Sequence, residues 1–122
     1  MKYARDNRAQ IVGEGGDLYL VGRSLGGAVA AYVATHPDTP HDLFTGVILE
    51  STFTSVADMV DALFYRPISM FKRTILEIDW KTIEAVENLT LPVLYITGDK
   101  DELVPTAMTQ ELYEASTSTP LK

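Results

Sequence analysis

Residues 22–26 read Gly-Arg-Ser-Leu-Gly, a G-x-S-x-G pattern with a serine at its centre. An apolar run, Leu18–Val21, leads into the pattern, and the small, helix-permissive residues Gly27–Ala34 follow it. This arrangement predicts a strand that turns abruptly into a helix, with Ser24 at the apex of the turn. A serine hydroxyl exposed at such a turn is suited to nucleophilic attack on a carbonyl carbon.

The glycines flanking this serine have a physical reason to be there. Gly22 and Gly26 stand two residues before and two after Ser24. In so tight a turn we expect both to lie close to neighbouring backbone, where a residue without Cβ fits. The next backbone N–H, that of Leu25, is expected at the helix N-terminus, facing the position where an oxyanion would form.

A serine of ordinary pKa needs a base, usually histidine, and a carboxylate that orients the base. Asp101 is the favoured acid, because it lies a few residues past the apolar run Pro92–Thr97, in a loop that Gly98 helps to turn. Two alternatives stay open. Asp99 lies in the same loop, where it could instead bond its own backbone as a turn residue, and Glu50 ends the preceding apolar run.

Neither histidine of the chain suits the role of base. His36 falls at the far end of the helix that begins after Ser24, and a rise of about 1.5 Å per residue puts it roughly 18 Å from the serine. His41 lies further along the same loop. We interpret both as surface-loop residues and expect the catalytic histidine to lie outside these residues.

Three apolar runs and the helices between them place the candidate residues. The runs are Leu18–Val21, Thr45–Leu49 and Pro92–Thr97, and the first shows no polar alternation, as expected for a strand buried on both faces. Predicted strands and helices follow one another in turn along the chain. This order predicts a parallel α/β sheet with right-handed crossovers. The carboxyl ends of parallel strands share one rim, so Ser24 and the candidate acids should meet there. Helices are expected at Leu25–Thr35, near Val56–Phe64, at Trp80–Leu89 and from Pro105 or Thr106 to about Ala115, the second capped by Ser55 and Asp58.

The remaining segments carry simpler expectations. Met1–Gln10 is interpreted as the tail end of a helix, with Tyr3, Ala4 and Ala9 as its buried face. Tyr65–Trp80 is interpreted as a linker and helix packed on the core, with a lid over the site as the alternative. The chain is expected to form one domain, 1–122, with a polar tail that frays from about residue 116.

Composition excludes several classes of function. The 122 residues carry a formal net charge of −7, which disfavours binding to nucleic acid or, through charge, to an anionic membrane. The sequence contains no cysteine and only two histidines, so neither a cofactor nor a metal site is expected. The sequence shows no membrane span and no signal peptide, and it leaves the compartment undetermined.

The quoted motifs together resemble the α/β-hydrolase superfamily. Leu18–Ala30, Leu49–Phe53 and Ile96–Pro105 are most similar to the branch that holds the Bem-forty-six-like proteins and α/β-hydrolase domain-containing protein thirteen. The resemblance implies Ser24 as nucleophile and Asp101 as acid. It also implies a partial fold, about strands five to seven of an eight-stranded sheet, and an upstream anchor, which suggests a membrane-associated parent.

The resemblance further implies a serine hydrolase acting on acyl esters or thioesters, including protein palmitoyl thioesters, with its histidine and second oxyanion donor outside these residues. The partner is then a small-molecule or protein-linked acyl substrate. The alternatives are a catalytically incomplete module that acts by interaction and, third, an acyltransferase. Because three adjacent strands leave an apolar edge on each side, we expect the 122 residues alone to be marginally stable or prone to aggregation.

Overall fold

Three short parallel strands form the centre of the structure, a computed structural model that describes residues 2–13, 15–63 and 80–122. The strands are β1 (Tyr19–Arg23), β2 (Gly46–Glu50) and β3 (Val93–Ile96), in the order β1-β2-β3. Their register pairs Arg23 with Glu50 and Glu50 with Ile96, so the carboxyl ends of all three strands lie level. The parallel α/β sheet expected from the sequence is confirmed.

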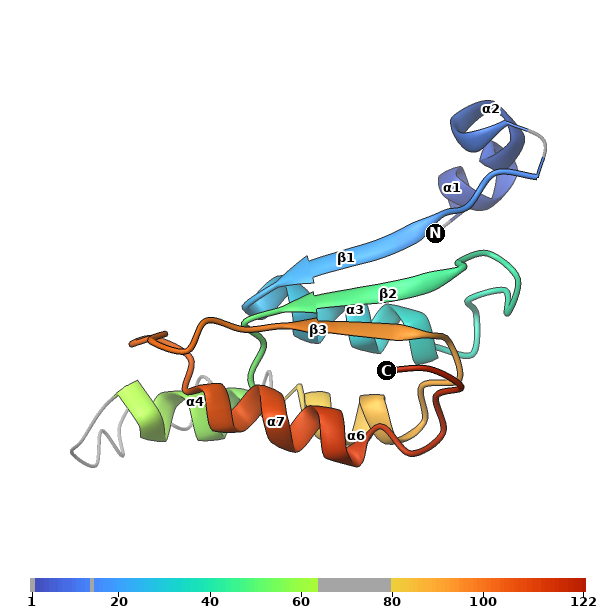
Figure 1. Ribbon diagram of the computed structural model, residues 1–122. Helices are drawn as coiled ribbons and strands as arrows, with labels where there is room; N and C mark the ends of the chain where they lie inside the picture. The colour runs from blue at the N-terminus through green and yellow to red at the C-terminus, as the bar shows by residue number, and fades with distance from the viewer. Residues whose placement is uncertain (1, 14, 64–79) are drawn as a thin grey trace.

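One layer of helices covers one face of this sheet (Figure 1). Helix α3 (Leu25–Thr35) packs on β1 and β2, α6 (Thr82–Glu87) packs between α3 and the last helix, and α7 (Thr106–Ala115) contacts β3. Helix α4 (Val56–Leu63) lies in the same layer. These helices fall where the sequence predicted them, within a few residues at each end.

The core lies between the sheet and this helical layer. Leu49 of β2, Leu89 after α6 and Leu112 of α7 are fully buried in it. A second cluster, formed by Ala28, Phe53 and Val104, lies below the carboxyl rim of the sheet and supports the loops there.

The other face of the sheet differs from the sequence expectation. Tyr19 and Val21 of β1 are 51% and 63% exposed, and Leu94 and Ile96 of β3 are 53% and 44% exposed. The prediction that the first strand is buried on both faces is therefore wrong for the described residues. An apolar run shows that a strand avoids water, but it does not say which part of a chain covers the second face.

Helix α4 begins with a variant capping box. The Ser55 hydroxyl accepts the Asp58 backbone N–H at 3.0 Å, and the Asp58 carboxylate in turn accepts the hydroxyls of Ser55 at 2.7 Å and Thr54 at 2.6 Å. These two hydroxyl bonds hold the pKa of Asp58 below its ordinary value, with burial opposing them weakly. The predicted cap at this position is confirmed.

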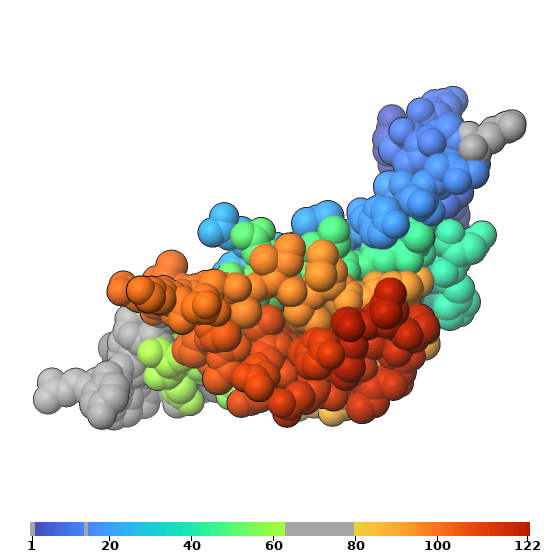
Figure 2. Space-filling view, in the orientation of Figure 1, coloured from blue at the N-terminus to red at the C-terminus, as the bar shows by residue number. Residues whose placement is uncertain are grey.

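The N-terminal segment forms two short helices, α1 (Lys2–Asp6) and α2 (Arg8–Val12), that stand away from the sheet (Figure 2). Neither helix buries a residue, and Tyr3 is 75% exposed. The expected buried face of Tyr3, Ala4 and Ala9 is therefore wrong within the described chain, because no other described element packs on it.

The C-terminal tail packs against the sheet instead of fraying. The Ser116 side chain is 1% exposed and contacts the Tyr95 hydroxyl. Thr119 donates its hydroxyl to the Leu91 carbonyl, and the Leu121 carbonyl accepts the Val93 N–H at 3.0 Å. The polar composition of the tail suggested fraying, but its hydroxyls find backbone acceptors around the start of β3.

The segment interpreted as a linker or a lid, Tyr65–Trp80, lies outside the described residues except for Trp80, which packs against the second cluster. Among the helices that the structure describes, none has the length and apolar character required to span a membrane.

Candidate active site

Ser24 lies at a sharp turn between β1 and α3. Its backbone has φ 52° and ψ −122°, a conformation that residues with a side chain rarely adopt. The Ser24 N–H donates to the Glu50 carbonyl at 2.9 Å, and the Ser24 carbonyl accepts the Gly27 N–H at 2.9 Å. The chain thus leaves the sheet and enters the helix within one residue, which leaves the partly exposed serine at the apex.

Gly22 is required by the closeness of this turn. A Cβ added there would collide with the Gly26 carbonyl and with Gly27 Cα, as the sequence analysis expected. A Cβ added at Gly26, in contrast, would meet no described atom within 4 Å. Gly26 therefore lies close to the Gly22 backbone, as expected, but of the two glycines only Gly22 lacks room for a side chain among the described residues.

Gly27 and Thr52 form a contact that the sequence analysis missed. A Cβ on Gly27 would overlap the Thr52 side chain, which is 1% exposed and donates its hydroxyl to the Ser24 carbonyl at 3.3 Å. The missed signal was the second glycine of the Gly26-Gly27 pair, at a position where the new helix crosses the end of β2.

Leu25 is the first residue of α3, as predicted. The N–H groups of a first helical turn have no partner inside the helix, and the helix dipole makes this end favourable for negative charge. The Leu25 N–H therefore lies in the first turn of α3, directly after Ser24.

Asp101 lies in the loop after β3, on the same rim of the sheet as Ser24. Its carboxylate accepts the backbone N–H groups of Leu103 and Val104, each at 2.9 Å. The bonds from Val104 and Leu103, then a hydroxyl bond from Ser51 and the charge of Arg23, lower the pKa of Asp101 from its ordinary value. The carboxylate is thus oriented by the backbone of its own loop, and its ionised form is favoured.

The two alternative acids lie in less constrained places. Glu50 ends β2, and its carboxylate is 3.7 Å from the Arg23 guanidinium, whose side chain is 76% exposed. Asp99 is an exposed residue of the turn that the Asp101 N–H closes onto the Gly98 carbonyl. Of the three candidates, Asp101 has the carboxylate with the most recorded donors.

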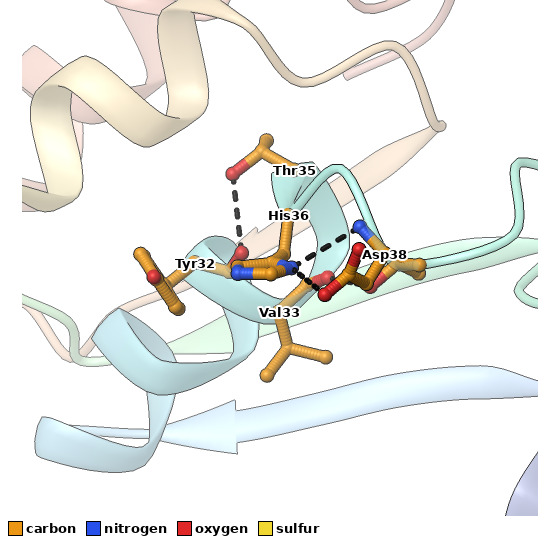
Figure 3. A network of polar contacts seen from close by, with 6 residues as sticks. Tyr32, Val33, Thr35, His36 and Asp38 are labelled. Atoms are coloured by element: carbon orange, nitrogen blue, oxygen red, sulfur yellow. Dashed lines mark hydrogen bonds and ion pairs between the residues drawn. The ribbon is translucent and has the colours of Figure 1, made fainter. Parts of the chain in front are cut away.

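His36 lies at the opposite end of α3 from Ser24, in a network of local contacts (Figure 3). Its ring packs against Tyr32, with ring centroids 5.3 Å apart, and its Nδ1 accepts the Asp38 N–H at 3.2 Å. His41 is an exposed residue of the loop that follows. The structure therefore brings neither described histidine to the rim where Ser24 and Asp101 lie.

Within the described residues, no group of three or more histidine, aspartate and glutamate side chains could hold a metal ion.

Residues 9–121 match the profile of the serine hydrolase family FSH1. The chain belongs to this family. This chain is 37% identical over 89 residues to protein bem46 of Schizosaccharomyces pombe, covering 72% of this chain and 28% of that protein. It is 33% identical to the α/β hydrolase domain-containing protein WAV2 of Arabidopsis thaliana, covering 79% and 33% of the two chains. The expected relationship to the Bem-forty-six-like proteins is confirmed.

Solved structures support the fold of this FSH1-type chain. The Pyrococcus furiosus esterase Pf2001 superposes with a TM-score of 0.66 at 16% identity, covering 99% of this chain and 49% of that one. A puromycin hydrolase superposes with a TM-score of 0.66 at 18% identity, covering 98% and 19%. The chain is a partial α/β-hydrolase fold, and it spans about a third of the length of the curated relatives it matches.

Proposed function

We propose that these residues carry the nucleophile and the acid of a serine hydrolase that cleaves acyl esters or thioesters. Ser24 attacks the acyl carbonyl, the Leu25 N–H binds the oxyanion, and Asp101 orients a histidine contributed from outside residues 1–122. The observation that carries the proposal is the strained turn at Ser24, which lies on the same sheet rim as the ionised Asp101.

Each step uses a group that the site supplies. A histidine base takes the Ser24 proton as the oxygen bonds to the carbonyl carbon, and the leaving alcohol or thiol receives that proton. Water then releases the acyl group from Ser24 by the same route. The negative charge of Asp101 stabilises the imidazolium formed in both halves of the reaction.

The acyl group of the substrate is inferred from the resemblance to known proteins. The resemblance to Bem-forty-six-like proteins favours esters and thioesters, including protein palmitoyl thioesters. A membrane-associated parent protein is consistent with a relative in Saccharomyces cerevisiae that is described as a membrane protein and is 39% identical over 106 residues. The specificity can be measured with short and long p-nitrophenyl esters against a palmitoyl thioester, using the full-length protein.

A fluorophosphonate probe tests the nucleophile. We expect the full-length protein to be labelled and Ser24→Ala to be unlabelled, with Ser118→Ala, a serine at the opposite end of the sheet, labelled like wild type. Labelling that survives Ser24→Ala would overturn the proposal. The 122 residues alone should show no turnover, because the described histidines lie away from the rim.

The second candidate function is an interaction module without catalysis. The open apolar face of the sheet, with Val21 and Leu94 more than half exposed, is the observation that favours it. An unlabelled full-length protein that still binds a partner through this face would decide for this alternative.

A further inference from the structure

Thr52 lies next to the candidate nucleophile, in the loop that follows β2. Its hydroxyl donates to the Ser24 carbonyl at 3.3 Å and to the Glu50 carbonyl at 3.4 Å. The hydroxyl hydrogen is thus shared between two acceptors, a three-centre arrangement of the kind found at helix ends. Because the side chain is fully buried, no water competes for this hydrogen, and it is directed at the turn that carries Ser24.

The two carbonyls that accept this hydroxyl are also the acceptors that hold the strained turn. The Ser24 N–H donates to the Glu50 carbonyl, and the Gly27 N–H donates to the Ser24 carbonyl, each at 2.9 Å. A positive φ such as that of Ser24 persists only where the surroundings fix it. The Thr52 hydroxyl therefore joins the acceptor at the entry of the turn to the acceptor at its exit.

The carbon atoms of the Thr52 side chain fix the start of α3. A Cβ added to Gly27 would lie 2.8 Å from Thr52 Cβ and 2.9 Å from Thr52 Cγ2, so the first turn of the helix packs directly on this side chain. Thr52 is itself anchored, because its carbonyl accepts the hydroxyl of Thr109, a buried residue of α7, at 3.4 Å. The side chain therefore has little freedom to move away from the turn.

We propose that Thr52 is a positioning residue for the nucleophile of this site: its buried hydroxyl holds the Ser24 carbonyl and so fixes the direction in which the serine side chain leaves the turn. This inference rests on the proposed function and deepens it. Thr52 acts through the backbone of Ser24, since its hydroxyl is bonded to carbonyl groups and not directed at a substrate.

The direction of the serine side chain matters because its hydroxyl must meet the acyl carbon and the base at the same time. That direction is set by the backbone of Ser24. A turn that relaxes toward ordinary negative φ would point the hydroxyl elsewhere. Loss of the Thr52 hydroxyl should therefore lower kcat and leave KM nearly unchanged, because no contact with the bound substrate is removed.

The experiment uses the full-length protein and matched substitutions of buried threonines. Thr52→Val removes the hydroxyl and keeps the branched shape, whereas Thr52→Ser keeps the hydroxyl and removes the methyl group. Thr39→Val is the control. Thr39 is also buried, and its hydroxyl donates to the Val33 carbonyl at 2.6 Å, at the end of α3 opposite Ser24. This control loses the same kind of bond to the same helix.

We expect Thr52→Val to lower kcat on a p-nitrophenyl ester by about two- to tenfold, the effect of one hydrogen bond, and to slow fluorophosphonate labelling of Ser24 by a similar factor. Thr52→Ser should recover most of both rates, and Thr39→Val should keep both. Unchanged rates in Thr52→Val, or an equal loss in Thr52→Ser or in Thr39→Val, overturn the inference. If Thr52→Val does not fold, Thr52→Ala is compared with Thr52→Ser, because those two variants differ by the hydroxyl alone.

Amide hydrogen exchange supplies a readout that does not depend on activity. The N–H groups of Ser24 and Gly27 bond to the carbonyls that Thr52 also holds, so both should exchange faster in Thr52→Val and return toward wild type in Thr52→Ser. Thr39→Val should leave them unchanged. Wild-type exchange at both amides in Thr52→Val contradicts the inference. Absence of probe labelling at Ser24 in wild type overturns the proposed function instead, and the exchange rates still decide whether Thr52 holds the turn.

Discussion

The Thr52 side chain occupies the place where Gly27 would carry a Cβ. Thr52 is 1% exposed and lies between β2 and α4, while Gly27 is buried in the first turn of α3. Because the Thr52 hydroxyl also donates to the Ser24 carbonyl, this contact joins the loop after β2 to the turn that holds the candidate nucleophile.

Replacing Gly27 by alanine should destabilise the protein. The new methyl group has no room beside the buried Thr52, and overpacking of this kind costs about 1–3 kcal/mol. Gly26→Ala is the matched control, because its methyl group meets no described atom and alanine favours a helix by about 0.4–1 kcal/mol. Urea unfolding of both variants measures the difference, and equal midpoints would contradict the Gly27–Thr52 contact.

The core should depend strongly on Leu49. This side chain is fully buried between the sheet and the helices, so Leu49→Ala should lower the free energy of unfolding by about 2–5 kcal/mol. Leu121→Ala removes the same atoms from a side chain that is 70% exposed. This control should change the free energy of unfolding by less than about 0.5 kcal/mol. Thermal unfolding compares the two, and a similar loss in both would place the core elsewhere.

Stability should fall in acid where Asp58 is protonated. Its folded-state pKa lies below the ordinary value of 3.8, mainly because the Ser55 and Thr54 hydroxyls donate to the carboxylate. The folded state therefore favours the ionised form, so this contribution is complete above about pH 4 and is lost as the pH falls through the folded-state pKa. Asp58→Asn should reduce the slope of stability against pH in that window.

The cap itself can be tested at neutral pH. Ser55→Ala removes the acceptor for the Asp58 N–H and should cost about 0.5–2 kcal/mol. Ser118→Ala, which removes a hydroxyl bonded to the Glu87 carbonyl at an exposed site, is the comparison and should cost less. Helix α4 would not depend on the cap if both variants unfolded at the same urea concentration.

The open face of the sheet should make the 122 residues associate when they are produced alone. Val21 and Leu94 expose apolar side chains on this face, and both β1 and β3 are edge strands in the described sheet. Sedimentation should detect association, and the double variant Val21→Thr with Leu94→Thr should reduce it. A cooperative thermal melt of a monomer at wild-type sequence would argue against this prediction.

The elements that could be predicted are those whose signals are local. The strand before Ser24, the helix after it and the Ser55–Asp58 cap each depend on residues within a few positions of one another. The alternation of these elements was enough to place Ser24 and Asp101 at one rim, because parallel strands end at the same side.

Contacts between distant segments could not be predicted in this way. The contact of Gly27 with Thr52 joins residues 25 positions apart, and no local pattern encodes it. The packing of the C-terminal tail could not be predicted either. Its composition is polar, but the Thr119 hydroxyl donates to the carbonyl of Leu91, which lies 28 residues earlier in the chain.

The sequence by itself determined the parallel α/β order, the strained turn at Ser24 and the family, because periodicity and glycine spacing act over short distances. Only the tertiary structure decided which sheet face is covered, why Gly22 rather than Gly26 is confined, and that Thr52 fills the space beside Gly27. These depend on which surfaces meet once the chain is packed, and packing is set by shape in three dimensions rather than by neighbours along the chain.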